Sequence, residues 1–346
     1  MSQRAAKEES AAPWRDQPPG TFLGPEALAM SGADLLRALK DGALPDPPLT
    51  RLADLRVTEV GLGTATMAMP ASGWWQSGAG VFPAGVLAFM ADSALGSAVL
   101  TAALPGAGMV TTEMSLNFVR PATMRSGWLI GRGHVIHATR SQALAEASLD
   151  DERGRLLAHG TSRGLLTPID PARLRNAPPP SADQLGPTPL QLAPCGDVRG
   201  QEYWNTLDGI DIVREAVAGA FNPPYAILVG LRFTAGAEGT ASTAIDTSPW
   251  LANAFGSIFG GIIALVADIT MNSAVLTHLP KATSFAPLDL KVNFLRPVLP
   301  GSGDITATAA VAHLGRTLAV ATCEVLDPGG KPAAIASSDT PPGPGA

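Results

Sequence analysis

The sequence contains an internal repeat with a period of 176 residues. Asp92 recurs as Asp268 (268 − 92 = 176), and the run NFVRP at 117–121 recurs as NFLRP at 293–297 with the same offset. The repeating units of solenoid proteins are much shorter, at roughly 20–50 residues. A period this long indicates a whole duplicated domain. Residues that differ between the copies then point to different roles for the two halves.

Length and composition limit the class of protein. A chain of 346 residues holds about two domains, and a composition of 46% hydrophobic and 16% charged residues is globular. The net charge of −6 leaves no basic surface for nucleic acid. Two cysteines cannot form a disulfide framework, and no spacing among the cysteines and five histidines resembles a metal site. No glycine-rich phosphate loop follows a predicted strand.

Two apolar segments, 81–104 and 258–279, approach the ~20 residues that a membrane span requires. Each contains a carboxylate, Asp92 or Asp268, and a charge at bilayer depth is costly. We therefore expect two helices that are buried on nearly all sides of a soluble domain, and no membrane contact. The first ten residues lack the apolar stretch of a secretory signal, so we expect a cytoplasmic protein.

The composition divides the chain into four parts. Residues 1–30 are expected to form a disordered tail, because they are rich in Pro, Glu, Ser and Ala. The first domain is expected at 31–167 and the second at 206–340. Between them, 168–205 is predicted to be a proline-rich linker, with three consecutive prolines at 178–180.

Each domain is predicted to combine one long apolar helix, at 85–103 or 261–279, with five or six antiparallel strands. In the strand predicted at 109–120, alternation places on one face Val110, Thr112, Met114, Leu116 and Phe118. An apolar helix needs cover on nearly every side, and a strongly curved antiparallel sheet supplies it. The predicted fold class is α+β, with two tandem domains that each wrap a sheet around a central helix.

A short motif precedes each apolar helix. Residues 253–261 read NAFGSIFGG, and Asp268 follows Phe259 by nine positions; residues 77–85 read SGAGVFPAG, and Asp92 follows Pro83 by nine. This pattern resembles the hotdog-fold thioesterases, in particular the PaaI-type branch. That branch has Asn-x-x-Gly-x-x-His-Gly-Gly at the start of the central helix and an Asp nine residues after the His. The resemblance covers about 47–165 and 223–338.

The resemblance implies two hotdog domains packed back to back as an intrachain pseudo-dimer, with sites at the seam. It implies an acyl-CoA thioesterase, which hydrolyses an acyl-CoA to a free acid and coenzyme A. Such chemistry needs a base or nucleophile near the carbonyl carbon and donors near the developing oxyanion. No metal or redox cofactor is implied. The expected partners are the acyl-CoA substrate and a second copy of the chain, since double hotdogs commonly form homodimers.

Carried over residue by residue, the family pattern implies a first site shared by both domains. Its carboxylate, hydroxyl, amide and helix-tip glycine would be Asp92, Thr111, Asn253 and Gly260. Alternatively, Asn253 is only a turn residue, and Asp92 satisfies backbone groups in the core. Substrate contacts are expected from Phe259 and Gly261, and from Arg140 and Arg316, since Arg suits the phosphates of coenzyme A.

A second site would combine Asp268 and Pro287 with Ser77 and Ala84, and keeps only the carboxylate of the pattern. We expect it to be degenerate or to bind ligand without turnover. The family histidine is absent from both copies, because Phe259 and Pro83 stand in its place.

Two rival functions follow from these departures. The missing histidine favours a non-catalytic protein that binds acyl-CoA or regulates through it. A hotdog enoyl-CoA hydratase is the other rival; it would carry Asp-x₄-His on the central helix, but Ser97 and Ser273 occupy that spacing.

Overall fold

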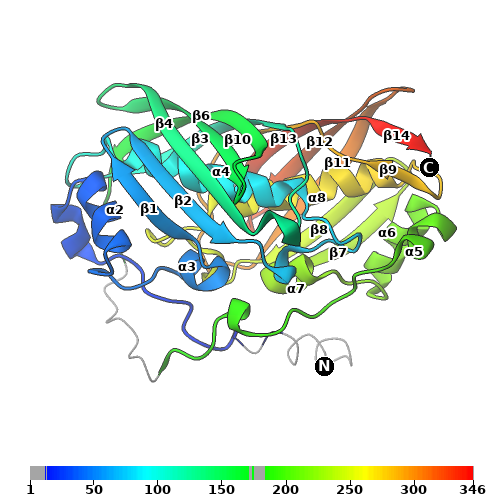
Figure 1. The fold of residues 1–346 in the computed structure, drawn as a ribbon, viewed down its shortest axis with the longest axis horizontal. Coiled ribbons are helices and arrows are strands. Elements are labelled where there is room, and N and C mark those ends of the chain that lie inside the picture. Colours follow the sequence, from blue (N-terminus) through cyan, green and yellow to red (C-terminus); the bar gives the residue numbers. More distant parts are fainter. Residues whose placement is uncertain (1–11, 13, 171–173, 175–183, 346) are drawn as a thin grey trace.

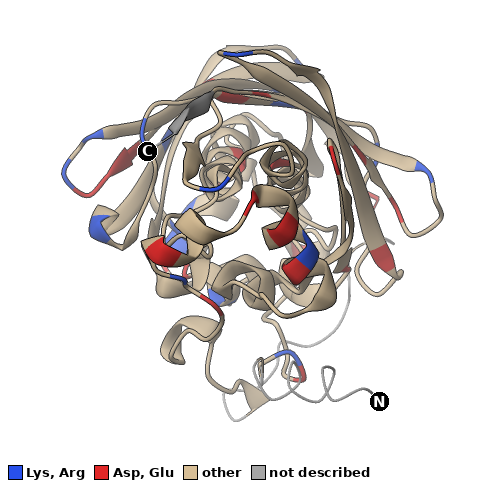
Figure 2. Cartoon of the chain, turned by 90° about the vertical axis from the view of Figure 1, so that its right-hand side faces the viewer, with Lys and Arg blue, Asp and Glu red and all other residues tan. Residues whose placement is uncertain are grey.

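The computed structural model describes residues 12, 14–170, 174 and 184–345, and shows two halves with the same architecture (Figure 1). Each half has a 17-residue central helix, α4 (Ala84–Leu100) or α8 (Gly260–Leu276). Seen end on, the two helices lie side by side and the sheet arches over both (Figure 2). The predicted α+β class, with curved antiparallel sheet around central helices, is confirmed.

Twelve strands form one antiparallel sheet in the order β1-β2-β4-β5-β6-β3-β10-β13-β12-β11-β8-β7. The first half contributes β1 (Arg56–Gly61), β2 (Thr64–Pro70), β3 (Ala107–Phe118), β4 (Trp128–Ala138), β5 (Gln142–Asp151) and β6 (Leu156–Pro168). The second half contributes β7 (Leu231–Ala237), β8 (Thr240–Asp246), β10 (Asp289–Phe294), β11 (Asp304–Leu314), β12 (Ala319–Leu326) and β13 (Pro332–Thr340). A separate two-stranded sheet pairs β9 (Thr283–Phe285) with β14 (Pro342–Gly345).

Short helices cover the open side of the arch. They are α2 (Gly32–Lys40), α3 (Pro48–Ala53), α5 (Gln201–Thr206), α6 (Gly209–Ala218) and α7 (Pro224–Val229), with 3₁₀ turns η1 (Pro25–Ala29), η2 (Gly73–Trp75), η3 (Met124–Ser126), η6 (Pro189–Gln191) and η7 (Pro249–Leu251).

The halves meet where β3 pairs with β10. Ser115 lies opposite Lys291, its own repeat equivalent (291 − 115 = 176), and the flanking pairs Asn117–Asp289 and Glu113–Asn293 exchange roles. A local two-fold axis therefore passes between Ser115 and Lys291, as in an isologous dimer interface. The chain is an intrachain pseudo-dimer.

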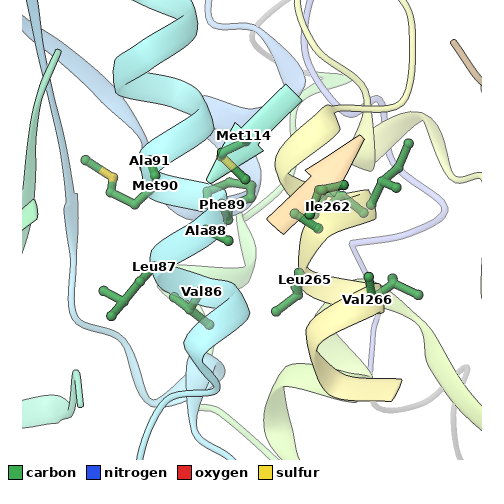
Figure 3. Packing of buried hydrophobic residues seen from close by; sticks show 14 of the residues in the cluster. Val86, Leu87, Ala88, Phe89, Met90, Ala91, Met114, Ile262, Leu265 and Val266 are labelled. Carbon is green, nitrogen blue, oxygen red and sulfur yellow. The ribbon is translucent and has the colours of Figure 1, made fainter. Parts of the chain in front are cut away.

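The central helices also pack on each other across this axis. Figure 3 shows Val86 and Phe89 of α4 beside Leu265 and Ile262 of α8, and all four side chains are buried. The sheet covers the remaining faces, so a helix that is apolar all round is accommodated. No helix among the described residues is both long enough and apolar enough to cross a membrane.

Both helices end three residues before the predicted limits of 103 and 279. The hydroxyl of Thr101 donates to the Ala98 carbonyl and accepts from the Gly63 amide at 2.8 Å. Its repeat equivalent Thr277 accepts from the Gly239 amide at the same distance. Each threonine thus ties the helix end to the β1–β2 or β7–β8 turn.

The predicted alternation of the strand 109–120 is wrong at its start. The register of β3 against β6 shifts between Thr111 and Glu113, which marks a β-bulge. Beyond the bulge Met114 and Leu116 share a face as predicted and are both buried, but Val110 is 47% exposed. The extra residue at the bulge exchanges the two faces of the strand on its N-terminal side. The Thr111 side chain therefore points toward α4, where it reaches Asp92.

The described part of the expected tail packs against the core. Trp14 is 1% exposed, and its ring meets Trp74 edge to face with centroids 4.9 Å apart. Part of the expected linker packs nearby, since the carbonyls of Pro189 and Leu192 accept from the Trp74 indole N–H. The composition of the expected tail and linker gave no indication of these packing contacts. Residues 1–11, 13, 171–173 and 175–183 lie outside the described part, and the four domain limits remain a prediction.

Candidate active site

Asp92 lies midway along α4 and meets the N-terminus of α8 from the other half. Its carboxylate accepts from the Thr111 hydroxyl at 2.9 Å and from the backbone N–H of Gly261. A Cβ atom placed on Gly260 would lie 2.7 Å from Asp92 Oδ2, so only glycine permits this approach. The structure thus brings together three of the predicted residues of the first site, Asp92, Thr111 and Gly260.

Burial changes the acidity of Asp92. The side chain is 3% exposed, and desolvation raises its pKa to about 6, although the hydrogen bonds from Thr111 and Gly261 lower it. A carboxylate with a pKa near 6 is a stronger base than an ordinary aspartate, yet is largely ionised at neutral pH. The environment therefore favours proton abstraction.

A cavity of about 630 Å³ opens beside this carboxylate and is lined by both halves. The first half contributes Asp92 and Thr111, and the second half contributes Asn253, Phe259 and Gly260. This volume lies within the range of small-molecule sites. A ligand in the cavity would have access to the carboxylate and to the tip of α8 at once.

Asn253 lines the cavity, but its side chain binds its own loop. Its Oδ1 accepts from the amides of Phe255 and Ser257, and its Nδ2 donates to the Ser257 hydroxyl at 2.9 Å. These bonds fit the alternative interpretation of a turn residue, which shapes the loop that leads into α8.

Phe259 occupies the position of the family histidine. Its ring packs edge to face on Phe89 of α4, with centroids 5.3 Å apart and an interplanar angle of 85°. It therefore supplies an apolar wall beside the Asp92 carboxylate, where the family has an imidazole. The adjoining Gly261 contributes its backbone N–H, which donates to the Asp92 carboxylate.

The structure does not bring Arg140 or Arg316 to the cavity. Arg140 lies in the exposed turn between β4 and β5, and Arg316 lies in the corresponding turn between β11 and β12. Neither is among the described residues that line the cavity.

The second site keeps the contact between carboxylate and helix tip. Asp268 is fully buried and accepts from the Gly85 amide at 2.7 Å. Gly85 is the repeat equivalent of Gly261 (261 − 85 = 176), so the arrangement obeys the local two-fold. Burial raises the pKa of Asp268 to about 7, although hydrogen bonds from Gly85 and Asn272 lower it.

The other predicted members of the second site make no hydroxyl contact to Asp268. Ala84 is the first residue of α4, Ser77 lies in the loop before it, and Pro287 separates β9 from β10. A proline there cannot supply the hydroxyl that Thr111 provides in the first half.

Sequence reasoning missed Asn272, which donates to Asp268 Oδ1 at 2.9 Å. Its repeat equivalent is Gly96 (272 − 96 = 176). The position one helical turn beyond the aspartate therefore has no side chain in the first half and carries an asparagine in the second. Likewise Tyr225, 6% exposed, stands where the first half has Leu49 (225 − 49 = 176). Burial and the nearby Asp268 raise the pKa of the Tyr225 hydroxyl. Comparing the copies position by position finds both substitutions.

Comparison with known proteins supports this architecture. The family model described as Thioesterase superfamily matches residues 80–158 and 255–334, once in each half. A Halobacterium salinarum protein named as an esterase is 40% identical over 75 residues, 21% of this chain and 48% of that protein. The chain thus spans about half the length of this curated relative.

Solved structures resemble the whole pseudo-dimer. The tesB protein of Mycobacterium avium subsp. paratuberculosis matches with a TM-score of 0.54 and 13% identity, over 86% of this chain and 98% of its own. A protein of unknown function with a hot dog fold from Alicyclobacillus acidocaldarius gives 0.52 and 13%, over 84% and 96%. Acyl-CoA thioesterase II TesB2 from Mycobacterium marinum gives 0.50 and 12%, over 85% and 97%. The chain is therefore a pair of tandem hotdog domains, each of which carries a match to the Thioesterase superfamily.

Proposed function

We propose that the protein is an acyl-CoA thioesterase, with its working site between the two domains at Asp92. The observation that carries this proposal is the buried carboxylate against the N-terminus of α8, beside a cavity of about 630 Å³. The match to the Thioesterase superfamily in both halves supports a thioester substrate. The name of the structurally similar M. marinum protein supports coenzyme A as the thiol.

In this proposal the thioester carbonyl lies at the tip of α8, next to Gly260. The first amides of a helix lack intrahelical acceptors, and the helix dipole places partial positive charge there. The Gly260 amide would then donate to the carbonyl oxygen as negative charge develops on it. The missing Cβ atom lets the Asp92 carboxylate approach the helix tip, so a carbonyl group bound at this amide would lie within reach of the carboxylate.

Asp92 acts as the general base. Its carboxylate takes a proton from a water molecule while the water oxygen attacks the carbonyl carbon, which gives a tetrahedral oxyanion. The oxyanion collapses, the carbon–sulfur bond breaks, and the proton on Asp92 passes to the leaving thiolate. The products are a carboxylic acid and coenzyme A. Thr111 holds the carboxylate in place through its hydroxyl.

The second site lacks the hydroxyl that Thr111 provides in the first site. Asn272 covers Asp268, and the side chain of Tyr225 is buried close to it. We therefore assign turnover to the first site alone, and a structural role to Asp268.

A thiol-release assay over short, long and aromatic acyl-CoAs tests the proposal with two matched variants. Asp92→Asn should lower kcat by about 10²–10⁴-fold, the usual contribution of a general base, whereas Asp268→Asn should retain most of its turnover. Equal losses in the two variants would contradict the asymmetry. Tight binding of acyl-CoA by the unaltered protein, with no thiol released from any substrate, would favour the binding protein instead.

A further inference from the structure

The cavity extends from Asp92 along one stripe of α4. The helix residues that line it are Asp92, Ser93, Gly96, Ser97 and Leu100. Asp92, Gly96 and Leu100 are spaced four residues apart, as are Ser93 and Ser97. All five therefore lie on one face of the helix. The eight residue-to-residue steps from Asp92 to Leu100 correspond to about 12 Å along the helix axis. We refer to this part of the cavity as the α4 arm.

The wall opposite the α4 stripe is aliphatic. It is built mainly by Leu35, Leu36 and Leu39 of α2, with Met67 of β2 and Met109 of β3. Besides Asp92, the charged residues that line the cavity are exposed and therefore belong to its rim: Lys40, Asp46, Arg56 and Arg296. An apolar arm with charges only at its rim and at Asp92 suits a hydrocarbon chain.

Gly96 controls the entrance of the α4 arm, one turn beyond Asp92. A Cβ atom at this position would lie 2.9 Å from the terminal methyl group of Met109. Glycine costs about 1 kcal/mol relative to alanine inside a helix. The end of the Met109 side chain therefore lies against Gly96, and a side chain at position 96 would push Met109 into the arm or enter the arm itself.

The second half shows what happens when the same space is not kept free. Asn272 replaces Gly96, and Leu276, the equivalent of Leu100, packs against a cluster of Ile212, Ala216 and Phe221. Phe221 stands where the first half has Pro45 (221 − 45 = 176), and its ring reaches the loop at Gly78. Asn272 and Phe221 thus place larger side chains where the first half has Gly96 and Pro45.

We infer that the α4 arm binds a straight aliphatic acyl chain of medium length, and that Gly96 is the residue that sets this preference. The inference rests on the proposed thioesterase function. An extended alkyl chain advances by about 1.3 Å per carbon, given C–C bonds near 1.5 Å. An arm of about 12 Å therefore takes roughly nine carbons beyond the carbonyl, and carbons further out gain no contact with it.

The test measures kcat/KM over saturated acyl-CoAs of increasing chain length. Each buried methylene should multiply kcat/KM about fourfold, from its transfer free energy, until the rise stops near ten carbons. In Gly96→Val the ratio of decanoyl-CoA to butyryl-CoA should fall by about 100-fold, since several methylenes lose their place. Gly96→Ala should give a smaller fall, because the methyl group of Met109 can move. The matched control Asn272→Ala should leave the ratio unchanged.

Binding separates this inference from the proposed function. Asp92→Asn protein should bind decanoyl-CoA far more tightly than butyryl-CoA in a calorimetric titration, and adding Gly96→Val should remove the difference. Absence of turnover with this binding pattern intact would refute the thioesterase and keep the acyl arm. Equal affinity for both ligands, or an equal loss of kcat/KM at every chain length in Gly96→Val, would overturn the inference.

Discussion

Two buried aspartates define this protein at the scale of single residues. Both are held by helix-tip amides of the opposite half, and in both burial raises the pKa, to about 6 in Asp92 and about 7 in Asp268. Their surroundings differ: Asp92 faces a cavity and a hydroxyl, and Asp268 faces the amide of Asn272. Identical side chains at equivalent positions thus receive different chemistry from their neighbours.

The pKa of Asp92 predicts the pH dependence of hydrolysis. A general base must be ionised, so kcat/KM should rise tenfold per pH unit below about pH 6 and become level above it. Thr111→Val removes a hydrogen bond that lowers the pKa of Asp92, so the inflection should move to higher pH. A pH–rate profile of both proteins measures this. An unmoved inflection in Thr111→Val would show that the hydroxyl does not act on the carboxylate.

Asp268 predicts a pH-dependent stability. Its pKa is raised on folding, so the folded state holds a proton that the unfolded state has lost, and the free energy of unfolding falls as pH rises from about 4 to about 7. In Asp268→Asn the side chain does not titrate, so this loss of stability with rising pH does not occur. The buried Asn272 Oδ1, which has no hydrogen-bond partner among the described residues, can accept from the new amide.

Urea titrations measure this effect. Relative to the unaltered protein, Asp268→Asn should gain on the order of 2–4 kcal/mol between pH 4 and pH 8. The gain should be level above about pH 7. A stability difference that does not change with pH would contradict the raised pKa.

At the scale of elements, the N-terminus of α8 is the component on which the site depends. Gly260→Ala would place a methyl group 2.7 Å from the Asp92 carboxylate and so displace the carboxylate from the helix tip. We expect kcat to fall by at least ~10²-fold, because a small misplacement of reacting groups costs that much. Circular dichroism should show a folded protein, since the nearest atom belongs to a side-chain end. Unchanged turnover would place the substrate elsewhere.

Element-scale features also show what the sequence predicts and what it does not. The repeat and the apolar helices were sufficient for the fold class, because hydrophobic periodicity is a local property. The bulge at Thr112 was not predictable, since it depends on register with β6. The same holds for Asn253, whose bonds to Ser257 depend on the course of its loop. The difference between Gly96 and Asn272 is visible in the repeat. Its consequence could not be predicted, because the sequence does not show that position 96 lines a cavity.

At the scale of the whole molecule, the shared sheet and core predict a single cooperative unfolding transition. Leu95 and Met271 are repeat equivalents (271 − 95 = 176) and are both at most 1% exposed, within one core that spans both halves. Leu95→Ala and Met271→Ala should each cost about 2–5 kcal/mol. In differential scanning calorimetry each variant should lower one common transition. Two separated transitions in either variant would show that the halves unfold independently.

The covalent union of the halves across the β3–β10 pairing has a consequence for how such a protein can change. In an assembly of two identical chains, every substitution is made twice, so one groove cannot be opened while the other is filled. Here position 96 can be glycine, which leaves space for a ligand, while position 272 carries a side chain that packs beside Asp268. The loss of stability that an open groove brings is then confined to one side of the molecule.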